Sequence, residues 1–174
     1  MMNDELIYLI GMMGSGKSTI GKILAQKRNY CFVDTDDLIE QKTKKSIKEI
    51  FDNEGEESFR NLETQVLKEV SAYSCSAIVA TGAGIIQKEI NRDYLSQGLV
   101  VWLDVDVEIL RQRISRDENR PLANNLESLF AERYPLYSSL ANLPIKCVEE
   151  QTPEQVANLI MEQILELLRI RDEG

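Results

Sequence analysis

The stretch that most constrains this chain runs from Gly11 to Ser18 and reads Gly-Met-Met-Gly-Ser-Gly-Lys-Ser. It fits the pattern G-x-x-x-x-G-K-[ST], with an apolar run before it at 6–10 and a helix-compatible run after it at 19–27. Strand, glycine-rich loop and helix in this order are the setting in which that pattern binds phosphate. The backbone N–H groups surround phosphate oxygens, and the helix dipole adds attraction. The motif therefore predicts a P-loop that binds a nucleoside triphosphate.

The residues of this motif have separate chemical tasks. Its glycines permit backbone angles and close approaches that a Cβ would obstruct. Lys17 is expected to reach the β- and γ-phosphates, and the Ser18 hydroxyl is expected to ligate Mg²⁺. A turn that is merely glycine-rich would explain neither the lysine nor the serine. The predicted nucleotide-binding set in this stretch is Gly11, Gly14, Ser15, Gly16, Lys17, Ser18 and Thr19.

Composition and charge exclude several classes of protein. The formal net charge is −9, so we expect no nucleic-acid partner, because there is no net basic field to collect phosphates. The chain contains no histidine, which excludes a His general base, a Ser-His-Asp triad and His-ligated metal. No stretch approaches membrane-spanning length, and the acidic N-terminus does not resemble a signal peptide. We therefore expect a cytoplasmic protein without a membrane partner.

The three cysteines, Cys31, Cys75 and Cys147, lie far apart in apolar runs, and no C-x-x-C spacing occurs. This pattern predicts buried structural thiols in a reducing compartment.

Apolar runs alternate with helical patterns along the chain. At 174 residues, we expect a single domain, 1–174. The alternation predicts an α/β fold with a parallel sheet buried on both faces and ligands at the carboxyl ends of its strands. The polar stretch at about 115–125 is expected to be a mobile loop. Strands are predicted at 6–10, 30–33, 77–80, 99–103 and 145–148, and helices at 17–27, 37–71 with breaks near Thr43 and Gly55, 88–96, 107–116, 126–141 and 152–169.

Paired carboxylates follow the second predicted strand, in Asp34-Thr35-Asp36-Asp37. Residues i and i+2 face the same way if the extended backbone persists, so Asp34 and Asp36 would both face the site. A phosphotransferase needs one carboxylate near Mg²⁺ and another that orients the acceptor hydroxyl and accepts its proton. The alternative, capping of the next helix, is the role expected for Asp37.

Two further patterns are ambiguous by themselves. Arg60 and Glu63 share a helix face, so the glutamate could aim the guanidinium at a second anion, but a surface ion pair has the same spacing. Gly82 and Gly84 directly after the third strand indicate either backbone closing on a ligand or a plain turn.

Arginines gather after the fourth predicted strand, at 111, 113, 116 and 120. An arginine in a lid over ATP would neutralise charge that develops during transfer, and Arg120 falls in the predicted mobile loop. A solvated helix face explains Arg111 and Arg116.

Taken together, these motifs make the chain similar to the shikimate kinases, from Glu5 to the last predicted helix. The resemblance implies a three-layer P-loop NTPase fold, a five-stranded parallel sheet flanked by helices as in nucleoside monophosphate kinases. It also implies a short lid at about 115–125 and acceptor-binding helices at about 36–71. It rests on six motifs in order: the P-loop, Asp34-Thr35-Asp36, Phe59-Arg60-x-x-Glu63, the glycines at Gly82, Arg120-Pro121-Leu122, and Arg133-x-Pro135-Leu136-Tyr137.

The resemblance implies transfer of the ATP γ-phosphoryl group to the 3-hydroxyl of shikimate, on the route to chorismate and aromatic amino acids, by a monomer that uses Mg²⁺. The residues implied to be catalytic are Asp36 as the base, with Lys17 and Arg120 on the phosphates. Ser18 and Asp34 would support Mg²⁺, and Arg113 and Pro153 would flank adenine. The implied substrate-binding residues are Asp36, Arg60, Glu63, Gly82, Ala83, Gly84 and Arg133, with the two arginines on the substrate carboxylate.

The chain departs from the family pattern at two places. Ala83 stands where the family has a glycine, so its methyl group could crowd the substrate or forbid a positive φ. The lid also reaches Arg133 after only thirteen residues from Arg120. Two alternatives remain: another small-molecule P-loop kinase, of the gluconate or nucleotide type, and a degenerate, non-catalytic nucleotide-binding module.

Overall fold

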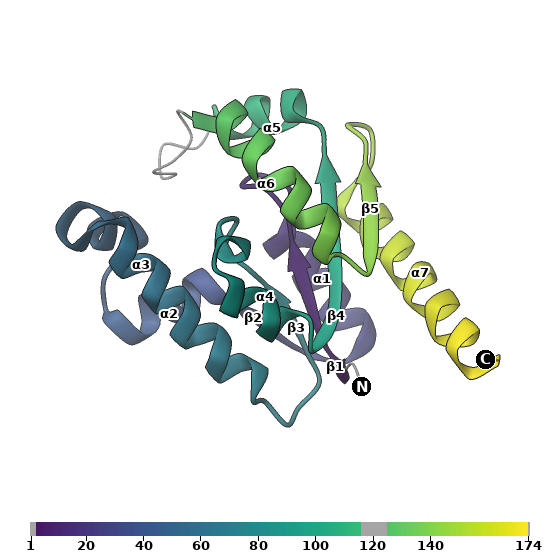
Figure 1. Ribbon diagram of the computed structural model, residues 1–174. Helices are drawn as coiled ribbons and strands as arrows, with labels where there is room; N and C mark the ends of the chain where they lie inside the picture. The colour runs from purple at the N-terminus through teal and green to yellow at the C-terminus, as the bar shows by residue number, and fades with distance from the viewer. Residues whose placement is uncertain (1–2, 116–124, 174) are drawn as a thin grey trace.

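The computed structural model describes residues 3–115 and 125–173. Five strands form one parallel sheet in the order β2-β3-β1-β4-β5 (Figure 1). Each predicted strand overlaps an observed one, so the predicted parallel sheet is confirmed. The strands are β1 (Asn3–Ile10), β2 (Cys31–Asp34), β3 (Ala77–Ala80), β4 (Gly98–Val105) and β5 (Leu143–Cys147).

Helices cover both faces of this sheet. On one face α1 packs against α7, and on the other lie α4 and α6 with α3 alongside (Figure 1). This is the three-layer arrangement that the resemblance implies. The helices are α1 (Lys17–Arg28), α2 (Thr35–Thr43), α3 (Ile47–Ser71), the 3-10 turn η1 (Ile85–Gln87), α4 (Glu89–Leu95), α5 (Val107–Ile114), α6 (Leu126–Leu140) and α7 (Pro153–Glu173).

Both predicted breaks in the 37–71 region are present. After α2 ends at Thr43, Ser46 caps α3 in a capping box with Glu49, each satisfying a backbone N–H of the other. Within α3, Gly55 has φ 83° and ψ 170°, a conformation that is accessible essentially to glycine alone. The break divides α3 into two segments, 47–54 and 56–71, and residues of both line the cavity described below.

Burial differs between central and edge strands. β3 and β4 are buried throughout, whereas β5 alternates between buried and exposed residues. The prediction of buried cysteines is wrong for two of the three, because Cys31 opens the edge strand β2 and Cys75 lies in the loop before β3, and both are exposed. Cys147, on the inward face of β5, is buried as predicted.

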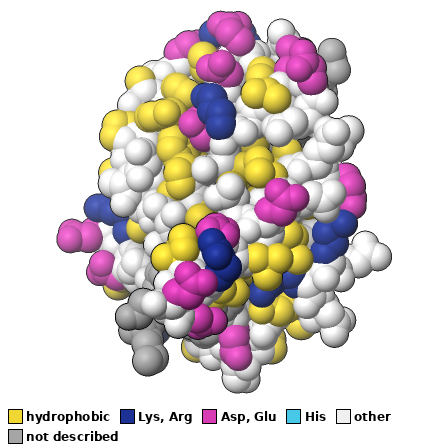
Figure 2. Space-filling view, turned by 90° about the vertical axis from the view of Figure 1, so that its right-hand side faces the viewer, with side chains coloured by type: hydrophobic (Ala, Val, Ile, Leu, Met, Phe, Trp, Pro, Cys, Tyr) yellow, Lys and Arg dark blue, Asp and Glu magenta, His cyan; other side chains and the backbone are white. Residues whose placement is uncertain are grey.

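One face of the molecule is chemically mixed. Figure 2 shows this face, on which basic side chains lie among acidic and apolar ones. In the described ranges 3–115 and 125–173, no helix is long and apolar enough to cross a bilayer.

Candidate active site

The glycine-rich loop between β1 and α1 has the backbone that a phosphate cradle needs. Gly11, Gly14 and Gly16 have φ values of 149°, 81° and 94°. A Cβ on Gly11 would also lie 2.9 Å from the Leu103 carbonyl oxygen. Lys17 Nζ donates to the carbonyl oxygens of Gly11 at 2.8 Å and Met12 at 2.9 Å, which holds the ammonium over the loop.

A cavity of about 180 Å³ opens beside this loop, and we call it the phosphate cavity. The structure brings five of the seven residues predicted in the P-loop stretch together there, with both predicted aspartates. It is lined by Met13, Gly14, Gly16, Lys17, Ser18, Thr19, Asp34, Asp36, Thr81, Gly82 and Ala83.

Asp34 connects the P-loop to the start of α2. It accepts a hydrogen bond from the Ser18 hydroxyl, and its Oδ1 caps α2 by accepting from the backbone N–H of Asp36 at 2.9 Å and of Asp37 at 3.3 Å. The prediction that Asp37 caps this helix is therefore wrong. The extended backbone also ends at Asp34, so the i, i+2 argument fails, although Asp34 and Asp36 both line the phosphate cavity.

Asp34 and Ser18 supply a carboxylate and a hydroxyl side by side. Mg²⁺ prefers such hard oxygen ligands and fills its remaining positions with water and phosphate oxygens. These two residues therefore fit the ion, even though the described residues contain no cluster of three or more acidic, Cys or His side chains that would hold a metal.

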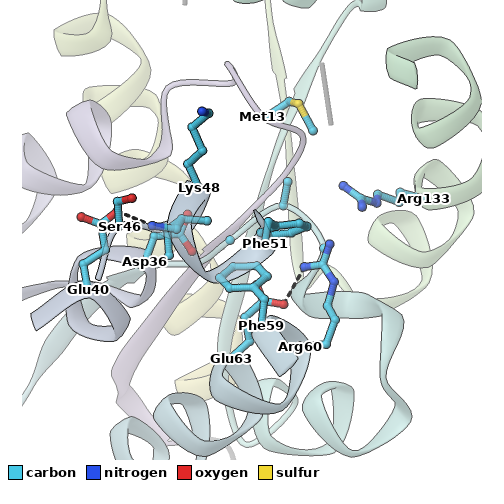
Figure 3. A pocket seen from close by; sticks show the side chains of 14 residues that line it. Met13, Asp36, Glu40, Ser46, Lys48, Phe51, Phe59, Arg60, Glu63 and Arg133 are labelled. Carbon is cyan, nitrogen blue, oxygen red and sulfur yellow. Dashed lines mark hydrogen bonds and ion pairs between the residues drawn. The ribbon is translucent and has the colours of Figure 1, made fainter. Parts of the chain in front are cut away.

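A larger cavity of about 530 Å³, the acceptor cavity, lies between α2, α3, the loop after β3, and α6 (Figure 3). Arg60 and Arg133 extend into it from α3 and α6, respectively. It is lined by Met13, Asp36, Glu40, Ser46, Ile47, Lys48, Phe51, Phe59, Arg60, Glu63, Gly82, Ala83, Gly84 and Arg133.

Arg60 and Glu63 form a buried pair in the wall of this cavity. Arg60 Nη1 donates to Glu63 Oε1 at 2.6 Å, and the Glu63 side chain is fully buried. The two flanking glycines make room for these groups: a Cβ on Gly84 would overlap the guanidinium, and one on Gly82 would lie 2.5 Å from Glu63 Oε2. The structure therefore explains these glycines by the close approach of their backbone to Arg60 and Glu63, whereas the predicted closing of this backbone on a ligand stays a prediction.

Arg133 is a buried cation with unused donors. Its residue is 1% exposed, and among residues 3–115 and 125–173 its Nε and Nη2 have no hydrogen-bond partner. Burial lowers the pKa of this guanidinium from its ordinary value. Leaving charged donors unpaired is costly, so the arrangement indicates an anionic ligand in the cavity.

Asp36 stands where the phosphate and acceptor cavities meet, since it lines both. Its Oδ1 is buried without a partner among the described residues, as is Glu63 Oε2. Burial raises the pKa of Asp36 to about 7, and the nearby Glu63 and Asp34 carboxylates add to the rise, while Lys17 and Arg60 oppose it. A carboxylate that titrates near neutrality is suited to general-base catalysis.

Ala83 lines both cavities without backbone strain. Among the described residues, positive φ occurs outside glycine at Asn29 and Lys44, so Ala83 does not need the angle that its methyl group would oppose. Its carbonyl oxygen accepts a hydrogen bond from the Tyr137 hydroxyl. Tyr137 also stacks on Trp102 with ring centroids 6.0 Å apart, so α6 is packed against β4 beside Arg133.

A third cavity, of about 300 Å³, contains both residues predicted to flank adenine, Arg113 and Pro153. Arg113 Nη1 donates to the Gly14 carbonyl oxygen at 3.0 Å, so this arginine reaches the P-loop. Ser15 also lines this cavity, with apolar walls from Ile20 and Val156. Arg111 instead pairs with Glu108 and Glu127 on the surface, as expected of a solvated helix face.

Some predictions lie outside the described residues, namely Arg120, Arg116 and the lid. Other residues that line the acceptor cavity are not among the predicted site residues: Met13, Glu40, Ser46, Ile47, Lys48, Phe51 and Phe59. A signal for part of this set was present, because Phe51 follows Ile47 by four positions and so lies on the same helix face.

The fold and the three cavities define a P-loop phosphotransferase with a separate pocket for a small anionic acceptor. A family model for shikimate kinase matches residues 13–165. The shikimate kinase of Trichormus variabilis is 49% identical over 94% of this chain and 92% of that protein. The chain therefore belongs to the shikimate kinase family, enzymes that transfer a phosphoryl group to an alcohol.

Solved structures agree with this assignment. Shikimate kinase from Acinetobacter baumannii, determined in complex with shikimate, superimposes with a TM-score of 0.88 at 39% identity, covering 92% of this chain and 93% of that one. A sugar kinase from Janibacter, at 20% identity and a TM-score of 0.63 over 90% of this chain and 92% of that one, shares the fold alone.

Proposed function

We propose that this chain phosphorylates the 3-hydroxyl of shikimate with ATP, giving shikimate 3-phosphate and ADP on the route to chorismate. The observation that carries this proposal is the position of Asp36, which lines both the phosphate cavity and the acceptor cavity. An acceptor hydroxyl beside Asp36 would face the γ-phosphoryl group held by the P-loop.

The donor half would hold ATP through its phosphates and its base. The N–H groups of the loop from Gly11 to Thr19 would bind phosphate oxygens, and Lys17 would move from the loop carbonyls to the β- and γ-phosphates. Arg113 and Pro153 would contact adenine in the third cavity. Mg²⁺, bound beside Ser18 and Asp34, would neutralise phosphate charge during transfer.

The acceptor half would recognise a carboxylated polyol. Arg133 would use its unpaired Nε and Nη2 on the substrate carboxylate, together with Arg60, which Glu63 orients. Such charge-assisted bonds contribute about 1.5–3 kcal/mol each and discriminate against neutral sugars. The backbone at 82–84 would lie along the ring of the substrate, and Asp36 would accept the proton of the attacking hydroxyl.

The setting proposed for this reaction is the cytoplasm, with the chain acting as a monomer and without nucleic-acid or membrane partners. The net charge of −9 supports the absence of a nucleic-acid partner. Size-exclusion chromatography with light scattering would test the monomer.

The deciding experiment measures ADP formation with Mg-ATP and a panel of acceptors: shikimate, quinate, gluconate and nucleoside monophosphates. Turnover with shikimate and not with gluconate or nucleotides is expected. Turnover with another acceptor in its place would contradict the proposal in favour of a different small-molecule kinase. ATP binding without turnover of any acceptor would indicate a non-catalytic module.

A further inference from the structure

The guanidinium of Arg60 is bonded to a second carboxylate besides that of Glu63. Beyond the bond from Nη1 to Glu63, the Nη2 atom lies 3.1 Å and the Nε atom 3.4 Å from Oε1 of Glu56. A guanidinium has five N–H donors arranged in a rigid plane. The carboxylates of Glu56 and Glu63 therefore accept hydrogen bonds from two different edges of that plane.

The two carboxylates differ in their surroundings. The side chain of Glu63 is fully buried, whereas that of Glu56 is 50% exposed. Glu56 is not among the residues that line the acceptor cavity, although Arg60 and Glu63 are. Glu56 thus contacts the guanidinium of Arg60 on its solvent-facing side and does not occupy the side that lines the acceptor cavity.

The chain around Glu56 explains how it reaches Arg60. Gly55 breaks α3, so Glu56 begins the second segment and lies one helical turn before Arg60. An acidic residue at a helix start is favoured by the dipole, and the i, i+4 spacing brings its carboxylate to the arginine. Below the plane, the backbone of Gly84 approaches so closely that a Cβ there would overlap the guanidinium.

From these contacts we propose that Glu56 is a second positioning residue for acceptor recognition. It holds the Nε and Nη2 edge of Arg60, Glu63 holds Nη1, and Gly84 supports the plane. The remaining N–H groups of Arg60 would then be available to the substrate carboxylate in the acceptor cavity, which Arg133 also lines. A single bond to Glu63 would let the guanidinium turn, and the second carboxylate fixes its orientation before the acceptor arrives. This inference rests on the proposed function, in which Arg60 binds the substrate carboxylate.

The test compares the full-length chain with Glu56→Ala, Glu56→Gln and the matched control Glu57→Ala. Glu57 is the next residue, is exposed, and its removal changes the net charge equally. Kinetic constants are measured for ATP, for shikimate and for its neutral carboxamide, and melting temperatures show that each variant folds.

For Glu56→Ala we expect the KM for shikimate to rise about 3- to 10-fold, with kcat and the KM for ATP within about twofold. The preference for shikimate over the carboxamide should fall by a similar factor, which a general loss of packing would not produce. Glu56→Gln, which keeps an acceptor oxygen without the charge, should lie between Glu56→Ala and the parent. Glu57→Ala should match the parent.

Three results would overturn the proposal. Equal constants for Glu56→Ala and Glu57→Ala would make the Glu56 contact an ordinary surface pair. A lower KM for shikimate would show that Glu56 competes with the substrate carboxylate. A fall in kcat alone would place its effect elsewhere. If Glu56→Ala does not fold, Glu56→Gln decides. Failure of the parent chain to phosphorylate shikimate would instead contradict the proposed function, so the two failures are distinguishable.

Discussion

The donor and acceptor halves of the site are built in opposite ways. The donor half comes mainly from one continuous stretch, Gly11–Thr19, whose lysine is held by carbonyls only five and six residues away. The acceptor half comes from α2, α3, the loop after β3 and α6, and four of its buried polar atoms lack partners among the described residues: Asp36 Oδ1, Glu63 Oε2, and Nε and Nη2 of Arg133. A local motif thus builds the phosphate cavity, whereas tertiary packing buries charged groups with unused hydrogen-bonding atoms in the acceptor cavity, where we propose that the acceptor binds.

The largest effect should come from Asp36, the proposed base, which lines both cavities. Asp36→Asn removes the proposed base while keeping nearly the same shape, and general-base catalysis contributes about 10²–10⁴-fold to rate. We expect kcat to fall within that range while ATP affinity, measured by calorimetry, stays within about twofold of the parent. Retained kcat would remove the assigned role of Asp36.

Next in size is a change confined to the acceptor half. Arg133→Ala should raise the KM for shikimate about 10- to 100-fold, since a charge-assisted bond contributes about 1.5–3 kcal/mol. The KM for ATP should change little, because Arg133 does not line the phosphate cavity. Equal effects on both KM values would contradict the separation of the two halves. Arg169→Ala, on the exposed surface of α7, is the control.

The pH profile should show the raised pKa of Asp36. A base must be ionised, so kcat/KM should fall about tenfold per pH unit as the pH drops below about 7, where the pKa of Asp36 lies. In Asp36→Asn the residual rate should lose this limb. A parent profile that stays flat down to pH 5 would show that Asp36 does not act as the base.

The free energy of unfolding should also depend on the ionisation of Asp36. Folding favours the protonated carboxyl, whereas catalysis needs the ionised one. The pKa of Asp36 is about 7 in the folded chain against an ordinary value of 3.8, so the native state binds more protons than the unfolded chain between these pH values. Stability is therefore lost as the pH rises from about 4 to 7. Asp36→Asn avoids burying this charge and should raise the Tm at pH 8 by roughly 2–8 °C, at about 2–4 °C per kcal/mol. An equal rise at pH 4 would point to a cause other than ionisation.

The smallest effect is expected at Ala83. Because its φ is not positive, Ala83→Gly should change the KM for shikimate less than about twofold. It should lower stability by about 0.4–1 kcal/mol, because a glycine adds freedom to the unfolded chain. Denaturant unfolding and acceptor kinetics check both values, and a large fall in KM would show that the methyl group crowds the substrate.

Prediction from sequence succeeded where the signal is local. The P-loop, the alternation of strands and helices, and the break at Gly55 depend on neighbouring residues, and the structure contains all three. Prediction failed for the cap of α2, because the cap depends on the exact residue at which the helix begins. Asp34 rather than Asp37 caps α2 because the helix begins one residue after the strand ends.

Other features depend on distant packing that no local pattern encodes. The apolar neighbours of Cys31 and Cys75 predict a core position, but an edge strand and a loop expose these two side chains. The burial of the Arg60–Glu63 pair follows from the approach of Gly82 and Gly84, which lie about twenty residues further along the chain. Spacing alone could not separate this pair from a surface ion pair.

The packing of α6 on β4 has a practical consequence. Trp102 is the chain's one tryptophan, and its ring meets Tyr134 edge-on at 4.9 Å and stacks on Tyr137. Both tyrosines follow Arg133 on α6, at one and four positions, and the Tyr137 hydroxyl also donates to the Ala83 carbonyl oxygen. The molecule therefore carries an intrinsic fluorophore packed against the helix that holds Arg133, and a change in Trp102 emission on addition of shikimate would show, without any attached label, that this helix responds to the acceptor.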